Sequence, residues 1–251
     1  MGAGEVGGSP GVGAKQRKIL VSQSYNPGRT TSTIAGAWQR ADTMNQHLPR
    51  LLGHSFGDGY IHRARQYFVY TNSAQELHNA VIKNITIVFG KVSQSHRTSI
   101  GGTPQIQFSS IVGKELHKNG TPRGSKIRQR TTIPSTTTRG DEQAASNFLG
   151  ALCDDEAQVR TDSGSKQIAL KSAKMSALEA ELEEYLNQIR EMFENLGISC
   201  STPKRDRTYT RQDETRISKR IWITGSNNFV TFARKIMLNY AQKKARLQTL
   251  L

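Results

Sequence analysis

The sequence contains, at residues 51–59, the segment Leu51-Leu52-Gly53-His54-Ser55-Phe56-Gly57-Asp58-Gly59. Its apolar residues recur at helical spacing, and Gly53 and Gly57 lie one turn apart on the same side of the predicted helix. Because a glycine weakens a helix by about 1 kcal/mol relative to alanine, two at this spacing predict that another backbone packs closely here. The segment ends on one acid, Asp58, between two glycines.

A second segment, at residues 149–157, has the same outline: Leu149-Gly150-Ala151-Leu152-Cys153-Asp154-Asp155-Glu156-Ala157. Ala151 stands where the first segment has Gly53, and Glu156 stands where it has Asp58. If the two segments are copies, they form a helix interface through Gly53, Gly57 and Ala151 and bring both acids to one central site. The neighbouring Asp154 and Asp155 are interpreted as helix-end or solvated charges.

The sequence around each segment repeats in the same order, which predicts a duplicated αββαββα unit. After the first segment we expect a hairpin at 60–73, a helix that ends at Gly90, a strand at 105–108 and a short helix. After the second we expect a hairpin at 159–171, a helix that ends at Gly197, a strand at 220–224 and one last helix running from about 227 to the end. A capping box, Ser73 with Glu76 and Ser176 with Glu179, is expected to open the middle helix of each copy.

The chain is accordingly divided into four parts by composition and pattern. Residues 1–45 are interpreted as a flexible basic extension with a short helix near 34–40, and 46–120 as the first repeat. Residues 121–146 are interpreted as a basic linker, because they are rich in Pro, Gly, Ser and Thr, and 147–251 as the second repeat. Lys126 and the other linker cations are expected to contact a phosphate backbone.

The charge of the chain indicates a polyanionic partner. Lys and Arg number 35 against 20 Asp and Glu, a net charge of +15, which favours nucleic acid over a membrane surface or a small-molecule substrate. The sequence has no apolar run that would span a bilayer and no signal-peptide core, which predicts a soluble intracellular protein of the cytoplasm, the nucleoid or an organelle matrix. The two cysteines lack metal-ligand spacing, so a structural zinc site is not expected.

At these residues the chain resembles the LAGLIDADG homing endonucleases of the single-chain, two-motif type. The resemblance rests on the order and spacing of several stretches over roughly residues 45–251: the two segments at 51–59 and 149–157, the strand ends at 70–73 and 170–172, and 108–110, 120–126, 196–198 and 223–229. The second motif departs from the pattern, with Ala151 and Ala157 where the family usually has glycine.

The resemblance implies an α+β fold in which two motif helices cross at a pseudo-two-fold axis within a monomer. Two antiparallel four-stranded sheets would then form a saddle for double-stranded DNA. Asp58 and Glu156 would lie beside the scissile phosphates and hold Mg²⁺ or another divalent cation, which suits carboxylate oxygens. Asn72 and Lys171 occupy the places of polar or basic side chains that act near the phosphate in this family.

Residue type and position predict the side chains that contact DNA, because Arg and Gln read base edges in the major groove and cations bind phosphates. These residues lie in or beside the expected strands and are Arg63, Arg65, Gln105, Gln107, Arg160, Lys166, Arg216, Lys219 and Arg220.

Two other functions fit the basic charge. A degenerate relative would hold DNA without cutting it, or would act as an RNA maturase on its host intron RNA; Ala157 favours these, whereas the presence of both acids favours a nuclease. A structural ribosomal or packaging protein ranks last, because it does not account for a repeated motif with paired acids.

Overall fold

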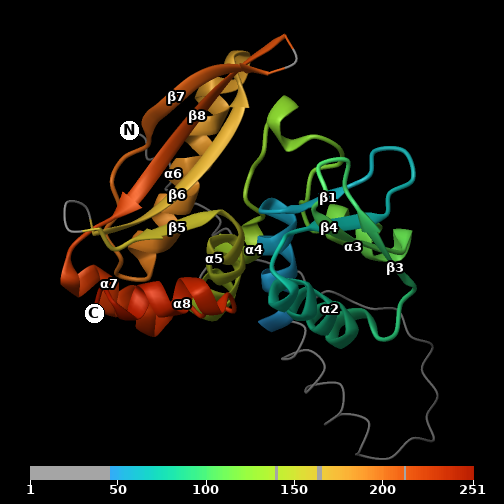
Figure 1. Ribbon diagram of the computed structural model, residues 1–251, viewed down its shortest axis with the longest axis horizontal. Helices are drawn as coiled ribbons and strands as arrows, with labels where there is room; N and C mark the ends of the chain where they lie inside the picture. Colours follow the sequence, from blue (N-terminus) through green and yellow to red (C-terminus); the bar gives the residue numbers. More distant parts are fainter. Residues whose placement is uncertain (1–45, 139–140, 163–165, 212) are drawn as a thin grey trace, which may run out of the picture.

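The computed structural model describes residues 46–138, 141–162, 166–211 and 213–251. The predicted extension at 1–45, with its short helix, lies outside the described residues. Two αββαββα units follow one another along the chain, which confirms the predicted α+β class (Figure 1). Among the described residues no helix is long and apolar enough to cross a membrane.

The first unit begins with a helix at residues 46–56, called here the first motif helix. It continues through β1 (Gly59–Ile61), β2 (Phe68–Thr71), α2 (Gln75–Phe89), β3 (Gln94–Thr98), β4 (Pro104–Phe108) and α3 (Ser110–Lys118). Between the units lie two short helices, η1 (Lys126–Arg128) and α4 (Ser135–Thr138).

The second unit begins with α5 (Glu142–Glu156), which is the second motif helix. It continues through β5 (Ala157–Arg160), β6 (Gln167–Met175), η2 (Ser176–Leu178), α6 (Glu179–Asn195), β7 (Lys204–Arg211), β8 (Glu214–Ile223), α7 (Ser226–Lys235) and α8 (Ala241–Gln248). α5 begins before the predicted Asn147 because the Asp141 side chain accepts hydrogen bonds from the backbone nitrogens of Gln143 and Ala144 and caps the helix there.

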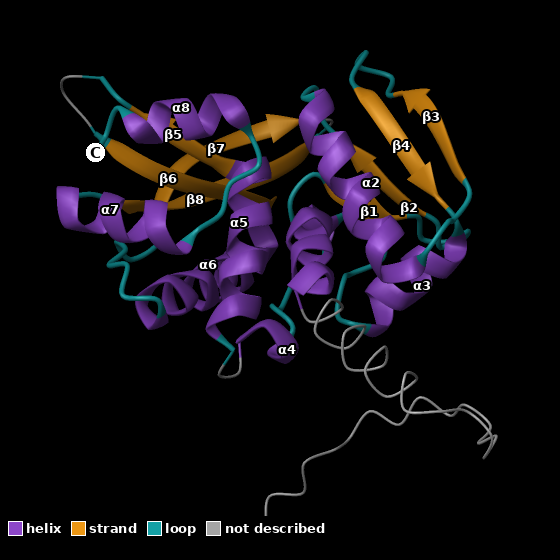
Figure 2. Ribbon diagram, turned by 90° about the horizontal axis from the view of Figure 1, so that it is seen from below, coloured by secondary structure: helices purple, strands orange, loops and turns teal. Residues whose placement is uncertain are grey.

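Both sheets are antiparallel and have the same strand order, β1-β2-β4-β3 and β5-β6-β8-β7. Figure 2 shows the two sheets side by side along one side of the molecule, with α3, α4, α5 and α6 on the other. Each sheet therefore buries one face under helices and leaves the opposite face open.

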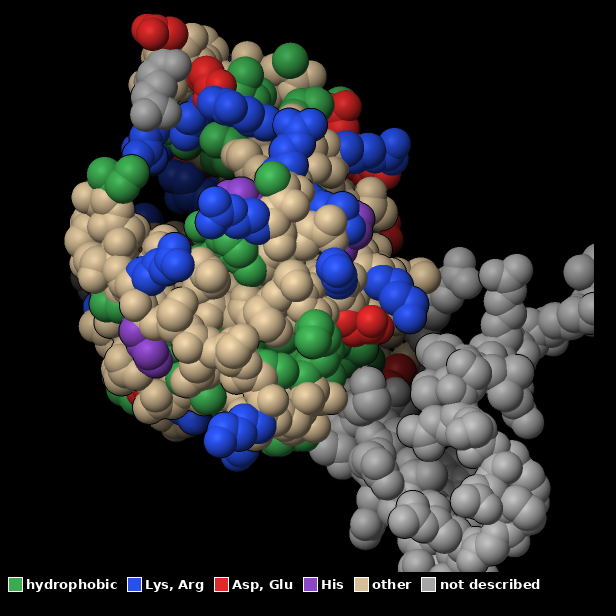
Figure 3. Space-filling view, turned by 90° about the vertical axis from the view of Figure 1, so that its right-hand side faces the viewer, with side chains coloured by type: hydrophobic (Ala, Val, Ile, Leu, Met, Phe, Trp, Pro, Cys, Tyr) green, Lys and Arg blue, Asp and Glu red, His purple; other side chains and the backbone are tan. Residues whose placement is uncertain are grey.

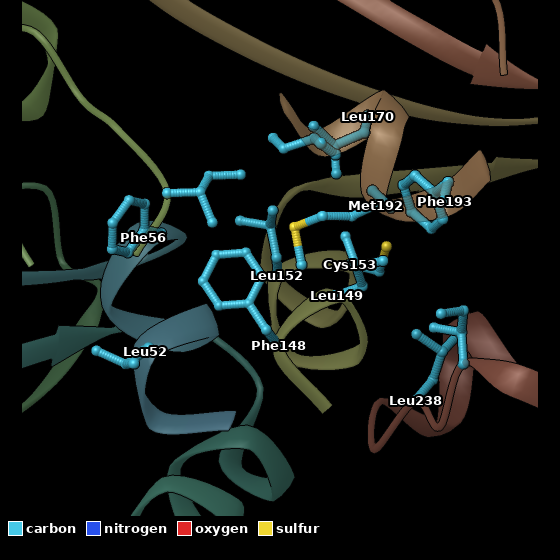
Figure 4. Packing of buried hydrophobic residues seen from close by; sticks show 14 of the residues in the cluster. Leu52, Phe56, Phe148, Leu149, Leu152, Cys153, Leu170, Met192, Phe193 and Leu238 are labelled. Carbon is cyan, nitrogen blue, oxygen red and sulfur yellow. The ribbon is translucent and has the colours of Figure 1, made fainter. Parts of the chain in front are cut away.

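The two motif helices pack against each other through small residues and one aromatic pair. A Cβ on Gly53 would lie 2.3 Å from the backbone oxygen of Phe148 and 2.8 Å from the Cβ of Ala151, so only glycine permits this approach. Phe56 and Phe148 meet across the contact with ring centroids 5.6 Å apart (Figure 4). The contact joins the two units into one hydrophobic core.

Neither predicted capping box forms. α2 begins at Gln75, and the side chain that helps its start is Asn72, whose Oδ1 accepts a hydrogen bond from the Ala74 nitrogen. In the second unit the chain forms the 3₁₀ turn η2 before α6, so Ser176 is not the residue that caps α6. The predicted ends are correct: Gly90 directly follows α2 with φ of +72°, and Gly197 lies two residues after the end of α6 with φ of +78°.

The single last helix predicted from about 227 is wrong, because the chain leaves the helix at 236–240 between α7 and α8. The buried Asp154 carboxylate accepts hydrogen bonds from the backbone nitrogens of Asn239 and Tyr240, at 2.8 to 3.0 Å. Arg50 donates to the Met237 oxygen at 3.0 Å. These contacts use backbone groups that a continuous helix would bond internally.

Candidate active site and nucleic-acid interface

The two predicted acids lie at the ends of the motif helices. Glu156 is the last residue of α5, and Asp58 follows the first motif helix by two residues. Asn72, from the end of β2, donates from Nδ2 to Asp58 Oδ2 at 2.7 Å and so fixes the orientation of this carboxylate. Asn72, which the resemblance places near the scissile phosphate, thus contacts the first of the two acids.

A third carboxylate, Asp155, has a completely buried side chain, and its charge acts on both acids. It accepts hydrogen bonds from the Tyr70 hydroxyl at 2.6 Å and the Asp58 backbone nitrogen at 3.2 Å, and its Oδ2 lies 3.1 Å from His54 Nδ1. A Cβ on Gly57 would lie 2.5 Å from the Asp155 Cβ, so glycine at 57 makes room for this side chain. The interpretation of Asp154 and Asp155 as solvated charges was therefore wrong, since both are buried and hydrogen-bonded.

Burial and neighbouring negative charges raise the pKa of both acids. Burial raises the pKa of Asp58 to about 7, with further contributions from the negative charges of Asp155 and Glu156. Burial also raises the pKa of Glu156, and Asp155 adds to that rise. Because the charge of Glu156 raises the pKa of Asp58, the two acids from different repeats belong to one electrostatic site.

Two lysines occupy matching positions at the ends of the motif helices. Lys126 donates from Nζ to the backbone oxygens of Ser55, Phe56 and Gly57, at 2.7 Å for Phe56. Lys243 donates to the backbone oxygens that end α5, at 2.8 Å for Cys153 and 2.6 Å for Asp154. Each lysine satisfies carbonyls at a helix C-terminus, where a positive charge is favoured.

Lys126 also lies close enough to both acids to lower the pKa of Asp58 and of Glu156, and Lys243 lowers that of Glu156. Sequence reasoning missed these roles. It assigned Lys126 to the DNA backbone, whereas its ammonium group is held by the first motif helix. No local sequence pattern marks Lys126 or Lys243 as partners of the motif helices, because only the fold brings these lysines to the helix ends.

Lys171 does not repeat the arrangement of Asn72. Its ammonium group pairs with Asp206 of β7, and it lines a cavity of about 380 Å³ that also contains Glu156, Arg160 and Arg220. Asp206 lies at a register shift between Arg205 and Arg207 and also approaches Arg220, at 3.6 Å. Lys171 and Glu156 thus face one cavity.

The open face of the second sheet is strongly basic. Residues paired across strands point to the same side of a sheet. Arg220 of β8 pairs with Lys171 of β6 and with Lys204 of β7, so these three cations share one side of the sheet. That side is opposite the apolar face against which α6 packs. The cations on this side, called here the second open face, are Arg160, Lys171, Lys204, Arg207, Arg211, Arg216 and Arg220. Those on β7 were missed, although Arg207, Tyr209 and Arg211 alternate with a period of two in the sequence.

Lys219 was predicted to contact DNA and lies on the wrong side of β8. It is 7% exposed and forms ion pairs with Glu179 at 3.1 Å and Glu183 at 2.5 Å, both on α6. The prediction failed because successive side chains of a strand point to opposite faces, and Lys219 points to the face opposite that of its neighbour Arg220. Arg216 is on the correct side but is only 8% exposed and bonds to Glu214 at 2.9 Å.

The open face of the first sheet is mostly neutral. Cross-strand pairs place on one side, called here the first open face, the side chains of Tyr60, Thr71, Ser95, Arg97, Gln105 and Gln107. The predicted Arg63 and Arg65 are exposed in the loop between β1 and β2, and Lys166 is exposed just before β6. In Figure 3, which views the molecule from the side of the first repeat, Lys and Arg side chains gather around a hollow in the upper part.

The donors at the centre fit a hard divalent cation. Mg²⁺ is held in proteins by one or two carboxylates together with water and substrate phosphates rather than by a complete protein cage. Within the described ranges no group of three or more His, Cys, Asp or Glu side chains could hold a metal alone. Asp58 and Glu156 would supply two such carboxylates. Because the pKa of Asp58 is raised, a bound cation would stabilise its ionised form.

Comparisons with known proteins agree with this architecture. A family described as LAGLIDADG-like domain matches residues 143–237. A mesophilic variant of the homing endonuclease I-DmoI is similar in structure, with a TM-score of 0.53 and 13% identity over 81% of this chain and 97% of that one. I-DmoI in complex with DNA and Ca gives the same values. Full-length DUF199/WhiA from Thermatoga maritima gives a TM-score of 0.52 and 10% identity over 82% of this chain and 60% of that one.

A curated relative is the tRNA-splicing ligase RtcB from Pyrococcus furiosus, which is 28% identical over 131 residues. The match takes in 51% of this chain and 13% of the length of that relative. Host intron RNA, a partner expected from the resemblance, gains no support from these comparisons.

Proposed function

We propose that the chain is a LAGLIDADG protein of the single-chain, two-motif type that cleaves double-stranded DNA at specific sites with the help of a divalent cation. The observation that carries the proposal is that Asp58 and Glu156 lie at the ends of the two packed motif helices, close enough for the charge of Glu156 to raise the pKa of Asp58. A purely structural protein would not benefit from two acids at these positions, because burial and repulsion by neighbouring carboxylates both disfavour their charged forms.

Phosphodiester hydrolysis requires an activated water and neutralisation of the charge that develops on the phosphate. A divalent cation, when bound, supplies both effects. Asp58 and Glu156 are the residues that would hold it, and Asn72 keeps Asp58 oriented through the 2.7 Å hydrogen bond. Lys126 favours the ionised form of both acids, since its positive charge lowers the pKa of each.

The open faces of the two sheets supply the DNA contact. A two-stranded ribbon fits the major groove, and here two sheets lie side by side along one side of the molecule (Figure 2). Cations of the second open face neutralise phosphates, while Gln105 and Gln107 present the amide groups that pair with adenine. I-DmoI, which has a similar fold, forms a complex with DNA and Ca, and this supports a DNA contact here.

The test is cleavage of a supercoiled plasmid library carrying random inserts, with Mg²⁺ or Mn²⁺ and full-length protein. The unaltered protein should linearise a subset of plasmids. Asp58→Asn and Glu156→Gln should each lower this activity by about 100-fold or more, the upper end of the loss seen when even an indirect metal contact is removed. Asp162→Asn, an exposed acid in the loop after β5, is the matched control and should cleave normally. Equal cleavage by Asp58→Asn would refute the assignment.

A second candidate function is DNA binding without cleavage, and Asp155 favours it. This third buried carboxylate stands opposite Gly57 in the helix contact, and its charge raises the pKa of both Asp58 and Glu156. If the protein binds DNA without cleaving it, the unaltered protein should bind duplex DNA but should not linearise any plasmid of the library with any divalent cation. Asp58→Asn would then leave the affinity for DNA unchanged and the cleavage absent in both proteins.

A further inference from the structure

The two open faces differ in length. The strands of the first sheet have three to five residues, whereas β6, β7 and β8 have nine, eight and ten. At about 3.3 Å per residue, β8 extends over about 33 Å and β4 over about 17 Å. Duplex DNA rises about 3.4 Å per base pair, so a strand as long as β8 can follow roughly twice as many base pairs as β4.

The two faces also differ in charge. On the strands of the first open face Arg97 is the single cation among the described residues, and the groups beside it are hydroxyls and the amides of Gln105 and Gln107. The second open face has cations on all four strands, and those on β7 (Lys204, Arg207 and Arg211) are exposed. Gln105 is held in place by a 2.9 Å hydrogen bond from its Nε2 to Thr71 Oγ1.

Charge and hydrogen-bonding groups serve different purposes at a DNA surface. Contacts from cations to phosphates provide affinity that depends on salt and not on sequence. Hydrogen bonds to base edges provide discrimination between sequences: an amide gives them in pairs to adenine, and an arginine gives them in pairs to guanine. Because phosphate contacts are the commoner outcome for exposed cations, a face with many of them is suited first to the backbone. A face with one cation and an oriented amide has mainly base-edge hydrogen bonds to offer.

From these differences we propose that the two repeats divide the recognition of an asymmetric duplex: the second open face anchors a longer half-site through its phosphates, and the first open face carries most of the sequence discrimination over a shorter half-site. This proposal rests on the proposed function to the extent that both require duplex DNA as the ligand. It does not require cleavage.

The first measurement is the binding of full-length protein to a duplex of random sequence by fluorescence anisotropy at increasing NaCl concentration. Replacing Lys204, Arg207 and Arg211 by glutamine removes three exposed cations of the second open face. The slope of log affinity against log salt should fall in magnitude by up to about 2.7, since each phosphate contact contributes about 0.9.

Two variants serve as matched comparisons. Lys83→Gln with Lys114→Gln removes exposed cations from α2 and α3, on the helical side of the first unit, and should leave the slope unchanged. Gln105→Ala with Gln107→Ala should also leave the slope unchanged. All substituted side chains are exposed or half-buried, so equal thermal unfolding of each variant checks that the fold is intact.

The second measurement is repeated selection of bound sequences from a randomised duplex pool. Gln105→Ala with Gln107→Ala should relax the preferences of one short half of the selected site, while the triple variant at Lys204, Arg207 and Arg211 keeps the preferences. An unchanged slope for the triple variant, or relaxed preferences caused by it alone, would overturn the division of tasks. Failure of the unaltered protein to bind any duplex would overturn the proposed function as well.

Discussion

Replacing Asp58 with asparagine should stabilise the metal-free protein at pH 8, although the same change is expected to lower cleavage by about 100-fold or more. The reason is that the structure holds this carboxylate where its charge is unfavourable. Burial is the largest cause, and the neighbouring Asp155 and Glu156 add repulsion. Asparagine has nearly the same shape, and its side-chain oxygen can still accept the hydrogen bond from Asn72.

The size and direction of the effect follow from the pKa. The folded protein raises the pKa of Asp58 from 3.8 to about 7. Between these values the folded state binds more protons at this site than the unfolded state, so stability falls as the pH rises through this window. At about 1.36 kcal/mol for each pKa unit, the cost at pH 8 is at most about 4 kcal/mol. Because solvent reaches part of this side chain, we expect a gain of about 1 to 4 kcal/mol on substitution.

The assay is urea denaturation of both proteins with EDTA at pH 4 and at pH 8. At pH 8 the asparagine variant should have the higher free energy of unfolding, and at pH 4, where Asp58 is protonated in the folded protein, the difference should nearly vanish. The exposed Asp162→Asn should show no such pH-dependent gain. A variant that is less stable at pH 8, or equally stabilised at both pH values, would refute the reasoning.

Two further predictions concern the helix contact and the basic face. Gly53→Ala should lower the free energy of unfolding by about 3 kcal/mol, the upper end for overpacking, because the added Cβ would meet the backbone oxygen of Phe148 at 2.3 Å. Gly101→Ala, where the nearest atom is 4.0 Å away, should change it by less than about 0.5 kcal/mol; equal effects in chemical denaturation would contradict the proposed packing. Asp206→Asn should free Lys171 from its ion pair and steepen the salt dependence of binding to a random duplex by up to about 0.9. A shallower slope in the anisotropy titration would show that Asp206 does not restrain this cation.

The sequence was sufficient to predict the features that repeat. Apolar spacing and paired small residues located both motif helices, and the order of elements identified the duplicated unit and the sheets. Gly90 and Gly197 marked helix ends because a residue with positive φ is needed there. These signals are local or recur at a fixed distance, so they can be recognised without the fold.

Features that depend on contacts between distant residues could not be predicted in this way. Asp155 differs in no local respect from a solvated acid, and only the approach of the first motif helix buries it beside Tyr70. The break after α7 is stabilised by Asp154, more than 80 positions earlier in the chain. The side of β8 on which Lys219 lies follows from strand register, and a shift of one residue reverses it.

The central claim is that Asp58 and Glu156 hold one divalent cation jointly. Electron paramagnetic resonance of Mn²⁺ in the presence of full-length protein and a random duplex tests it directly. Asp58→Asn and Glu156→Gln should each remove the bound Mn²⁺ signal seen with the unaltered protein, and the double variant should have no greater effect. Retention of the bound signal by either single variant would contradict a shared site.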